Sequence, residues 1–516
     1  MPIHQQIQHI FVLALENRSF DHVFGSLALK RTQPEWMQQQ DGVDAVTGQP
    51  TCLDLPDLQF VSRVTPPDGS TPSTMSPMSP ASIVDFDPPH EYRHAFLMQN
   101  ATAPGDWLNV LRNSPLPPMS PDVVAPAIRN HPKLWQAASY LDMDTSTSSF
   151  RRLAEEFAVC DRWFSGLPGP TFPNRCFLHA ASANGLYDSP TGLELFENLT
   201  IDGIQFKNGT VFTSLEAKPN PIDWRIYFGS RFPQAYFLKH MTIWEWAEKY
   251  FNFSSDFASH LQQKSIQPGY IFIEPDYGAL IGSQMFAGGT CQHPPTSFSS
   301  GENLIASTYE LIRNSAYWNT SVLIVTYDEN GGFYDHARPD GLVTPPGDGS
   351  DYADGCAKLP ENQGFPGCAF DRLGYRVPTL VISPFIKRNT IDHRQYEHAS
   401  IPATILSQFG RQPLTERDAH AASIWQLLSA DLQRVDGTPT EAPRSIRPVN
   451  PSVVPDAPAI TAISDSERTH ALPAIKFKRD LQVQQDLNDL ENMTTPDQLA
   501  DFGKNIPAVL PPKLIS

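Results

Sequence analysis

Two apolar runs in this chain end at a pair of polar side chains, and this pattern constrains the fold more than any other feature. Residues 10–15 read IFVLAL and pass directly into Glu16 and Asn17, and the run VLIVTY passes into Asp328 and Glu329. Continuous apolar runs of this length are typical of buried parallel strands. Because working residues collect at the carboxyl ends of such strands, we expect both polar pairs at neighbouring strand ends.

The rest of the chain alternates between strand and helix patterns. Strand-like runs lie at residues 224–228, 270–273 and 379–383, and helical patterns lie at 148–157, 174–183, 301–313 and 398–409. This alternation predicts an α/β fold with a mostly parallel central sheet flanked by helices. Ser19 is expected to cap a short helix that runs through Phe24.

Proline-rich stretches indicate how the chain is divided. Residues 62–82 and 113–126 are rich in proline and serine, a composition that predicts long loops. Residues 436–475 are also rich in proline, and a polar helix candidate follows them. We therefore expect a catalytic domain over residues 1–430. Residues 431–516 are expected to form a linker and a peripheral extension, whose role the sequence does not indicate.

Charge and hydropathy exclude several classes of partner. The 516 residues include 38 Lys and Arg against 56 Asp and Glu, which gives a formal net charge of −18. This balance disfavours nucleic acid and broad docking onto anionic membranes. No apolar run approaches the roughly 18 residues of a membrane span, so no transmembrane segment is expected.

Compartment and thiol state stay open. The N-terminal segment of the chain as given has neither the basic start nor the cleavage site of a signal peptide. Cytoplasmic location and non-classical export are therefore both open. Cys356 and Cys368 bracket a loop rich in Gly and Pro, and pairing and free thiols are equally expected for them.

The polar pairs predict a cation site. Two acidic side chains and an amide at neighbouring strand ends are costly to bury unless a positive group lies among them. A hard divalent cation with oxygen ligands is the simplest candidate. Taken alone, each pair is also explained as a turn that caps the next element. Gly331 and Gly332, just after the second pair, suit a sharp backbone turn.

Thr171 stands between Pro170 and Pro173 at the predicted start of a helix. There its hydroxyl would feel the positive end of the helix dipole, and a nearby metal ion would lower its pKa enough for nucleophilic attack. The alternative is an ordinary threonine N-cap. Arg175, one turn later, is expected to direct its guanidinium at a phosphoryl oxyanion.

Four histidines are candidates for binding phosphate oxygens or for protonating a leaving alcohol. They are His90, His240, His293 and His336. Taken singly, each is more often a structural or surface histidine. Asp335 is expected to orient His336 because the two are adjacent.

Six motifs together resemble a known family. They are ENRSFDHVFG at 16–25, GPTFPNR at 169–175, HPP at 293–295, TYDENGGFYDH at 326–336, VISPF at 381–385 and YEHASIPAT at 396–404. In this order they are similar to the phosphoesterase family of phospholipases C, within the alkaline phosphatase superfamily. That family includes bacterial phosphatidylcholine-hydrolysing enzymes, plant non-specific phospholipases C and bacterial acid phosphatases. The resemblance runs in islands from about residue 10 to 414–422.

The resemblance implies roles for particular residues. Glu16, Asn17, Asp328 and Glu329 would bind the metal, with Thr171 as both nucleophile and ligand. His293 and His90 would contact the phosphate and the leaving group, and His240 is carried over without a strong surrounding motif. The family favours zinc slightly, with calcium, magnesium and manganese as alternatives. Cys176 stands where the family has an apolar residue, and the twin-arginine export signal of many bacterial members is not found.

The resemblance also implies the reaction. The chain is expected to be a metal-dependent phospholipase C that cleaves phosphatidylcholine-type lipids to diacylglycerol and a phosphorylated headgroup through a phosphothreonine. The main alternative is a broad acid phosphatase acting on small phosphate esters with the same core. A sulfatase is disfavoured because threonine cannot supply the required aldehyde, and a non-enzymatic lipid- or metal-binding protein is a further alternative. Transient contact with a membrane surface is compatible with phospholipase C activity. The oligomeric state is open.

Overall fold

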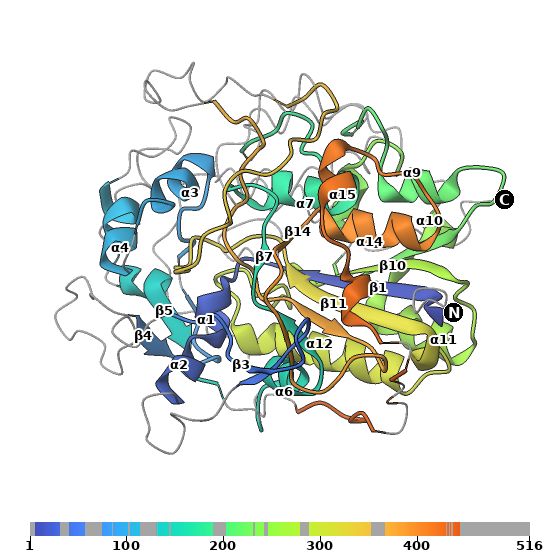
Figure 1. The fold of residues 1–516 in the computed structure, drawn as a ribbon, viewed down its shortest axis with the longest axis horizontal. Coiled ribbons are helices and arrows are strands. Elements are labelled where there is room, and N and C mark those ends of the chain that lie inside the picture. Colours follow the sequence, from blue (N-terminus) through green and yellow to red (C-terminus); the bar gives the residue numbers. More distant parts are fainter. Residues whose placement is uncertain are drawn as a thin grey trace.

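The computed structural model describes residues 6–30, 41–56, 75–84, 86–101, 104–113, 131, 133–143, 146–188, 203–230, 233–241, 246–278, 288–351, 367–429, 431, 432, 434 and 437–443. Within these residues the chain forms a ten-stranded sheet with helices packed around it (Figure 1). Most neighbouring strands are parallel, so the α/β fold class predicted from the sequence is confirmed.

A run of parallel strands forms the half of the sheet that positions the polar pairs. In spatial order they are β11 (Ser321–Tyr327), β1 (His9–Leu15), β10 (Gly269–Glu274), β8 (Asp223–Phe228) and β9 (Tyr250–Asn252). Leu15 pairs with Tyr327, and Leu13 pairs with Ile273 on the other side. The carboxyl ends of β1, β11 and β10 therefore lie at one edge of the sheet.

The other half of the sheet contains one reversal of direction. β12 (Leu380–Ile382) runs antiparallel to both of its neighbours, β11 and β6 (Ala158–Cys160). Beyond β6 follow β13 (Thr390–Asp392), β2 (Gly42–Asp44) and β3 (Pro50–Thr51). A separate parallel pair joins β7 (Trp163–Phe164) to β14 (Tyr396–Glu397).

One predicted loop contains a strand. The structure describes residues 75–82 of the segment 62–82, and there β4 (Ser76–Met78) pairs with β5 (Ser139–Leu141). Met75 and Met78 are buried, although serine and proline dominate the surrounding sequence. The prediction was wrong at this point because the pairing partner lies some sixty residues away and local composition does not report it.

Helices cover both faces of the sheet (Figure 1). One layer contains α7 (Thr171–Ala180), α9 (Val211–Glu216), α14 (Ser400–Gln408) and α15 (Glu416–His420). The other contains α6 (Ser149–Glu156), α11 (Ala258–Gln262) and α12 (Phe298–Arg313). A further group lies near β4 and β5 in Figure 1 and contains α1 (Phe20–Phe24), α2 (Ser26–Lys30), α3 (Tyr92–Met98) and α4 (Pro104–Asn113). The helix α10 (Trp246–Lys249) contacts β8.

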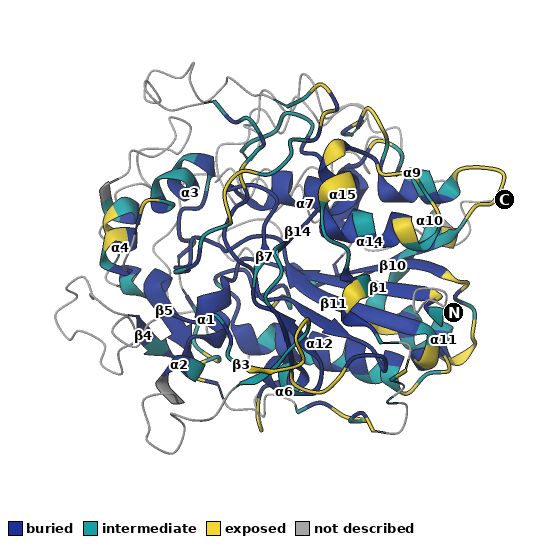
Figure 2. Cartoon of the chain, in the orientation of Figure 1, coloured by how far each residue is buried: buried dark blue, intermediate teal, exposed yellow. Residues whose placement is uncertain are grey.

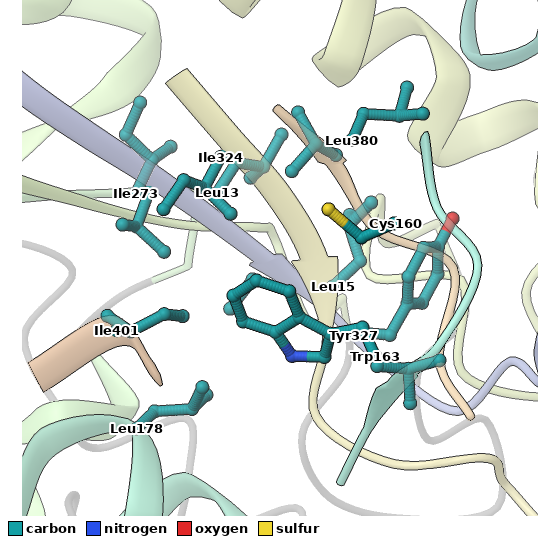
Figure 3. Packing of buried hydrophobic residues seen from close by; sticks show 14 of the residues in the cluster. Leu13, Leu15, Cys160, Trp163, Leu178, Ile273, Ile324, Tyr327, Leu380 and Ile401 are labelled. Carbon is teal, nitrogen blue, oxygen red and sulfur yellow. The ribbon is translucent and has the colours of Figure 1, made fainter. Parts of the chain in front are cut away.

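The parallel strands are buried on both faces, as their unbroken apolar sequence predicts. Every residue of β1, β10 and β11 is buried, and exposed residues lie mainly on outer helix surfaces and connections (Figure 2). Side chains of β1, β11 and β12 form one cluster, toward which Leu178 of α7 and Ile401 of α14 are directed (Figure 3). This packing holds α7 against the sheet, which matters because α7 carries Thr171.

Several predicted helix ends are confirmed. Ser19 caps α1, since its Oγ accepts a hydrogen bond of 3.1 Å from the N–H of His22. Ser148 caps α6 in the same way by accepting from the N–H of Arg151. Among the described residues, no helix has both the length and the apolar character needed to cross a lipid bilayer.

Little of the predicted C-terminal extension is described. The Tyr309 hydroxyl and the Asn314 amide of the α12 region donate to the carbonyls of Pro439 and Thr440 at 2.5 and 2.9 Å, so this short stretch lies against the catalytic part. The polar helix candidate, residues 114–126 of the predicted loop 113–126 and Cys356 lie outside the described residues, and residue 113 ends α4. The domain boundary at 430 and the pairing of Cys356 with Cys368 therefore stay predictions.

Candidate active site

The two polar pairs meet at the carboxyl ends of β1 and β11. The backbone N–H of Asn17 donates to Asp328 Oδ1 at 3.2 Å, and the N–H of Glu329 donates to the same oxygen at 2.8 Å. Asn17 adopts a left-handed backbone, with φ of 59°, which asparagine tolerates better than most residues. Residues more than three hundred positions apart thus form one polar cluster, as the sequence predicts.

Gly331 explains why the chain can turn so closely past Asn17. Both Gly331 and Gly332 have positive φ, 61° and 67°, as expected for the predicted turn. A Cβ on Gly331 would lie 2.6 Å from the Cβ of Asn17, too close for any side chain. The N–H of Gly331 donates to Glu329 Oε2 at 2.6 Å, so the turn also fixes that carboxylate.

Arg175 of α7 joins the acidic side chains. Its Nη2 lies 3.1 Å from Glu16 Oε1, and its Nε lies 3.3 Å from Asp328 Oδ2, with all three side chains buried. Its guanidinium also lies 5.5 Å from the ring centre of Tyr277. Burial opposes the charge, but Tyr277, Glu16 and Asp328 outweigh it and raise the pKa of Arg175. Two of its nitrogens contact carboxylates, and among the described residues its buried Nη1 makes no hydrogen bond, which leaves it available to an oxyanion.

The cluster carries more negative charge than Arg175 balances. Burial raises the pKa of Asp328 to about 6; Arg175 opposes this shift and Glu16 adds to it. Burial also raises the pKa of Glu329 well above its usual value; His90 opposes this shift and Asp328 adds to it. Both carboxyl groups therefore resist ionisation in the absence of a further positive charge.

The donor atoms suit a hard divalent cation. Both polar atoms of the Asn17 amide are fully buried without a hydrogen-bond partner among the described residues, and so is Glu329 Oε1. An unpartnered buried amide is expensive unless it binds something. Carboxylate and amide oxygens are the ligands that such cations prefer, so the residues present fit the implied metal.

Thr171 is the first residue of α7, not its cap. The N-cap is Pro170, whose side chain makes no capping bond, so the helix begins three residues earlier than the predicted 174 and the capping interpretation is wrong. The Thr171 hydroxyl makes no hydrogen bond to any described residue. Thr171 and Arg175 are four residues apart and therefore share a helix face, about 6 Å apart along the axis.

Asn174 fixes the backbone that leads into this helix. Its Nδ2 donates to the carbonyls of Gly169 and Pro170 at 2.9 and 3.1 Å, and its Oδ1 accepts from the N–H of Leu167 at 3.1 Å. The Asn174 side chain thus links the segment 167–170 to the first turn of α7. This locks the position of Thr171 without using its hydroxyl.

Two of the predicted histidines lie next to each other, and one of them contacts the cluster. The Nδ1–H of His90 donates to the Pro88 carbonyl at 2.6 Å, and that of His293 donates to the Pro294 carbonyl at 2.5 Å. His90 Nε2 lies 3.5 Å from Glu329 Oε1, and His293 Nε2 faces Asp87. The rings lie 6.4 Å apart, and Asp87 lies between them, 3.8 Å from His90 and 3.9 Å from His293.

His240 is not joined to this cluster by any described contact. Its Nε2 lies 3.3 Å from the Thr210 hydroxyl, and its ring packs against Phe212. Thr210 is the N-cap of α9. These neighbours place His240 beside the start of α9, and its catalytic role stays a prediction.

His336 lies in a second polar group. Its Nδ1 lies 2.8 Å from Asp21 Oδ2, and its Nε2 lies 3.1 Å from Asp54 Oδ1, so both ring nitrogens are engaged. Asp335 does not orient it as predicted, because that carboxylate pairs with Arg376 at 2.8 Å. Sequence adjacency was misleading, since neighbouring side chains here point to different partners. The contacts favour a structural role for His336.

This second group also resembles a metal site. Ligand atoms of Asp21, Asp335 and His336 lie within 4.8 Å of one another. The buried Arg376 guanidinium already lies among them, 2.8 Å from Asp21 Oδ1 and 3.2 Å from His336 Nδ1. Arg376 and His336 therefore offset the charges of Asp21 and Asp335 in this group. In the cluster around Asp328, the single guanidinium of Arg175 faces both Glu16 and Asp328.

The ion pairs of His336 predict a pH-dependent stability. Burial lowers its pKa, but Asp21 and the hydrogen bonds to Asp21 and Asp54 raise it to about 9 from 6.5. A raised histidine pKa stabilises the fold fully below pH 6.5 and loses that contribution as pH rises through 9. His336→Gln should lower the free energy of unfolding by on the order of 3 kcal/mol at pH 6, with little difference above pH 9.

Urea unfolding across this pH range measures the effect. The exposed His420→Gln is the matched control and should stay within about 0.5 kcal/mol of the parent. A constant offset for His336→Gln at every pH would contradict the charged pairing.

Sequence reasoning missed several side chains around the cluster. They are Asp87, Asn174, Glu274, Tyr277 and His398. Glu274 ends β10 and accepts from the backbone N–H of Gln234 and Ala235. The Nε2–H of His398 donates a hydrogen bond to the Asp328 carbonyl. The polar residues that follow the strand at 270–273 were the signal for Glu274 and Tyr277, by the same logic that found Glu16 and Asp328.

Comparisons with known proteins agree with the motifs. A model of the Phosphoesterase family matches residues 7–412. Non-specific phospholipase C6 of Arabidopsis thaliana is 31% identical over 437 residues, covering 82% of this chain and 72% of that protein. Non-specific phospholipase C3 of the same plant is 36% identical over 315 residues, 57% of this chain and 54% of the relative. Phospholipase C B of Mycobacterium tuberculosis is 27% identical over 424 residues, covering 78% and 73%.

Proposed function

The chain belongs to the Phosphoesterase family of phosphoric ester hydrolases, and from this premise we propose that it is a metal-dependent phospholipase C. It would cleave phosphatidylcholine-type lipids to diacylglycerol and a phosphorylated headgroup. Relatives named non-specific phospholipase C and phospholipase C support this substrate class. The observation that carries the proposal is the pair of contacts from Arg175 to Glu16 and Asp328, which brings the acidic strand ends to the helix of Thr171.

A divalent cation is proposed for the cluster, held by Glu16, Asn17, Asp328, Glu329 and Thr171. When bound, it would supply the positive charge that favours ionisation of the threonine hydroxyl and offsets charge on the phosphoryl group. Zinc is slightly favoured, with calcium, magnesium and manganese as alternatives, since oxygen ligands suit all four.

Side chains and backbone groups of the chain carry out the nucleophilic attack, the proton transfers and the binding of the phosphoryl oxygens. The Thr171 hydroxyl loses its proton to solvent and its oxygen attacks phosphorus. The bond from phosphorus to the leaving alcohol breaks as the protonated Nε2 of His90 or His293 gives that alcohol a proton. Backbone N–H groups at the start of α7 and the Nη1 of Arg175 donate to the phosphoryl oxygens. Water then hydrolyses the phosphothreonine, and the same histidines accept its proton.

A comparison of two substrates tests the proposal. Phosphatidylcholine in mixed micelles is expected to give diacylglycerol and phosphocholine in equal amounts, with a kcat/KM well above that for an aryl phosphate monoester. Chelation should abolish both activities, and metal analysis of the purified protein identifies the ion. A higher kcat/KM for the aryl phosphate would instead support the alternative, a broad acid phosphatase on the same core.

A further inference from the structure

Arg18 follows Asn17 directly and is 1% exposed, yet the mechanism above does not use it. Its backbone N–H donates to the Glu329 carbonyl at 3.2 Å. Its Nη2 donates to the carbonyls of Gln292 at 2.6 Å and Thr296 at 3.2 Å. These two carbonyls stand on either side of His293, so one side chain spans the base of the segment that carries this histidine.

The segment around His293 needs such support. Gln292 has a left-handed backbone, with φ of 73°, which is strained for a residue with a side chain. The Tyr327 hydroxyl donates to Gln292 Oε1 at 2.5 Å, and the Gln292 Nε2 donates to the Phe298 carbonyl. Thr296 in turn donates its hydroxyl to the His293 carbonyl at 2.6 Å. Arg18 contacts both ends of this arrangement from the strand end that carries Asn17.

The partners of Arg18 are unusual for a buried guanidinium. No carboxylate lies within ion-pair distance of it in the part of the chain that the structure describes, and its contacts are carbonyls, His22 at 3.3 Å and the Phe333 ring at 4.8 Å. Burying a charge without an opposite charge is expensive. Charge-assisted bonds to carbonyls recover part of that cost and impose a defined geometry on the segment they hold.

We infer that Arg18 is a positioning residue, which fixes the position of His293 relative to Asn17 and Glu329 at the ends of β1 and β11. This inference rests on the proposed function, because it assigns His293 to the phosphoryl group. Arg18 itself acts only through the carbonyls of Gln292 and Thr296. Its removal should let the Nε2 of His293 move relative to Asn17 and Glu329 while their own carboxylate and amide groups stay in place.

A double-mutant cycle with kinetics tests the coupling. Arg18→Met should lower kcat for the preferred ester by roughly 10- to 100-fold, the loss expected from a misplacement of about 1 Å. His293→Ala should lower kcat at least as much, and adding Arg18→Met to it should cause no further loss. Metal content per chain should be unchanged in Arg18→Met. Multiplicative losses in the double variant, or an unchanged kcat in folded Arg18→Met, would overturn the assignment.

Arg434 provides the matched control. It also donates to two backbone carbonyls, of Glu156 at 2.7 Å and Ile386 at 3.0 Å, and lies over the Phe157 ring at 5.5 Å. Unlike Arg18, it pairs in addition with a carboxylate, that of Glu156, at 3.1 Å. Its contacts lie outside the cluster. Arg434→Met should lower stability while kcat stays within about twofold of the parent, as for distant independent sites. A comparable loss of kcat in both variants would show that Arg18 acts through general stability and would overturn the inference.

Two further measurements keep the test decisive. If Arg18→Met does not fold, Arg18→Lys retains the charge with one compact donor and should show a smaller loss of kcat.

Binding of inorganic phosphate, followed by the ring ¹⁵N signals of His293, does not depend on turnover. Weakened phosphate binding in Arg18→Met but not in Arg434→Met supports the inference even if neither ester is hydrolysed, and equal binding in both contradicts it.

Discussion

Thr171→Ala is expected to lower kcat by about 10³-fold or more while the protein stays folded, because alanine offers no oxygen to attack phosphorus. The hydroxyl makes no hydrogen bond to the described residues, and Asn174 rather than Thr171 fixes the start of α7. The cost in stability should therefore be about 1 kcal/mol, the usual effect of one substitution. Steady-state kinetics and thermal unfolding of the same preparation measure both quantities.

Thr171→Ser is the matched variant for this experiment. It keeps a hydroxyl at the first position of α7 and should retain turnover within roughly tenfold, the loss expected when a nucleophile is kept but less well oriented. Acid quenching during turnover should trap phosphate on the peptide containing residue 171 in the parent and in Thr171→Ser. Near-normal kcat in Thr171→Ala, or phosphate trapped on another residue, would remove Thr171 from the role of nucleophile.

Asp328→Asn is expected to weaken binding of the divalent cation by at least about 100-fold, beyond what loss of an outer hydrogen-bond partner usually costs. The substitution keeps the size of the side chain and an oxygen that accepts from the N–H groups of Asn17 and Glu329. It removes the negative charge that attracts the cation. Elemental analysis and calorimetric titration with zinc, calcium, magnesium and manganese measure the change.

Asp335→Asn is the control that separates the two acidic groups. Asp335 is also buried and pairs with an arginine, Arg376, as Asp328 pairs with Arg175, but it belongs to the group of Asp21 and His336. Its replacement should lower stability and leave the metal content unchanged. Loss of metal in Asp335→Asn with retention in Asp328→Asn would move the cation to the group of Asp21, Asp335 and His336.

Strand positions and strand-end chemistry were predictable from sequence because they depend on local pattern. An unbroken apolar run followed by polar residues indicates a buried strand and its end, and this reasoning placed Glu16 and Asp328 at one edge of the sheet. The same reasoning applied to Glu274 at the end of β10 would have found it. Contacts between distant segments were not predictable in this way.

His336 and β4 illustrate the limit. The partners of His336, Asp21 and Asp54, are about three hundred residues away, and adjacency wrongly suggested Asp335. β4 forms because Ser76–Met78 lies beside Ser139–Leu141, which its proline and serine content does not reveal.

The four-residue interval between Thr171 and Arg175 has a mechanical consequence. Any rotation or sliding of α7 that displaced the hydroxyl would also pull the guanidinium from Glu16 and Asp328. The position of the proposed nucleophile and the neutralisation of these acids are therefore coupled. A single inserted residue would swing the hydroxyl by about 100° around the helix axis. Selection on this stretch should therefore preserve the count of residues between the two more strictly than the identity of Phe172.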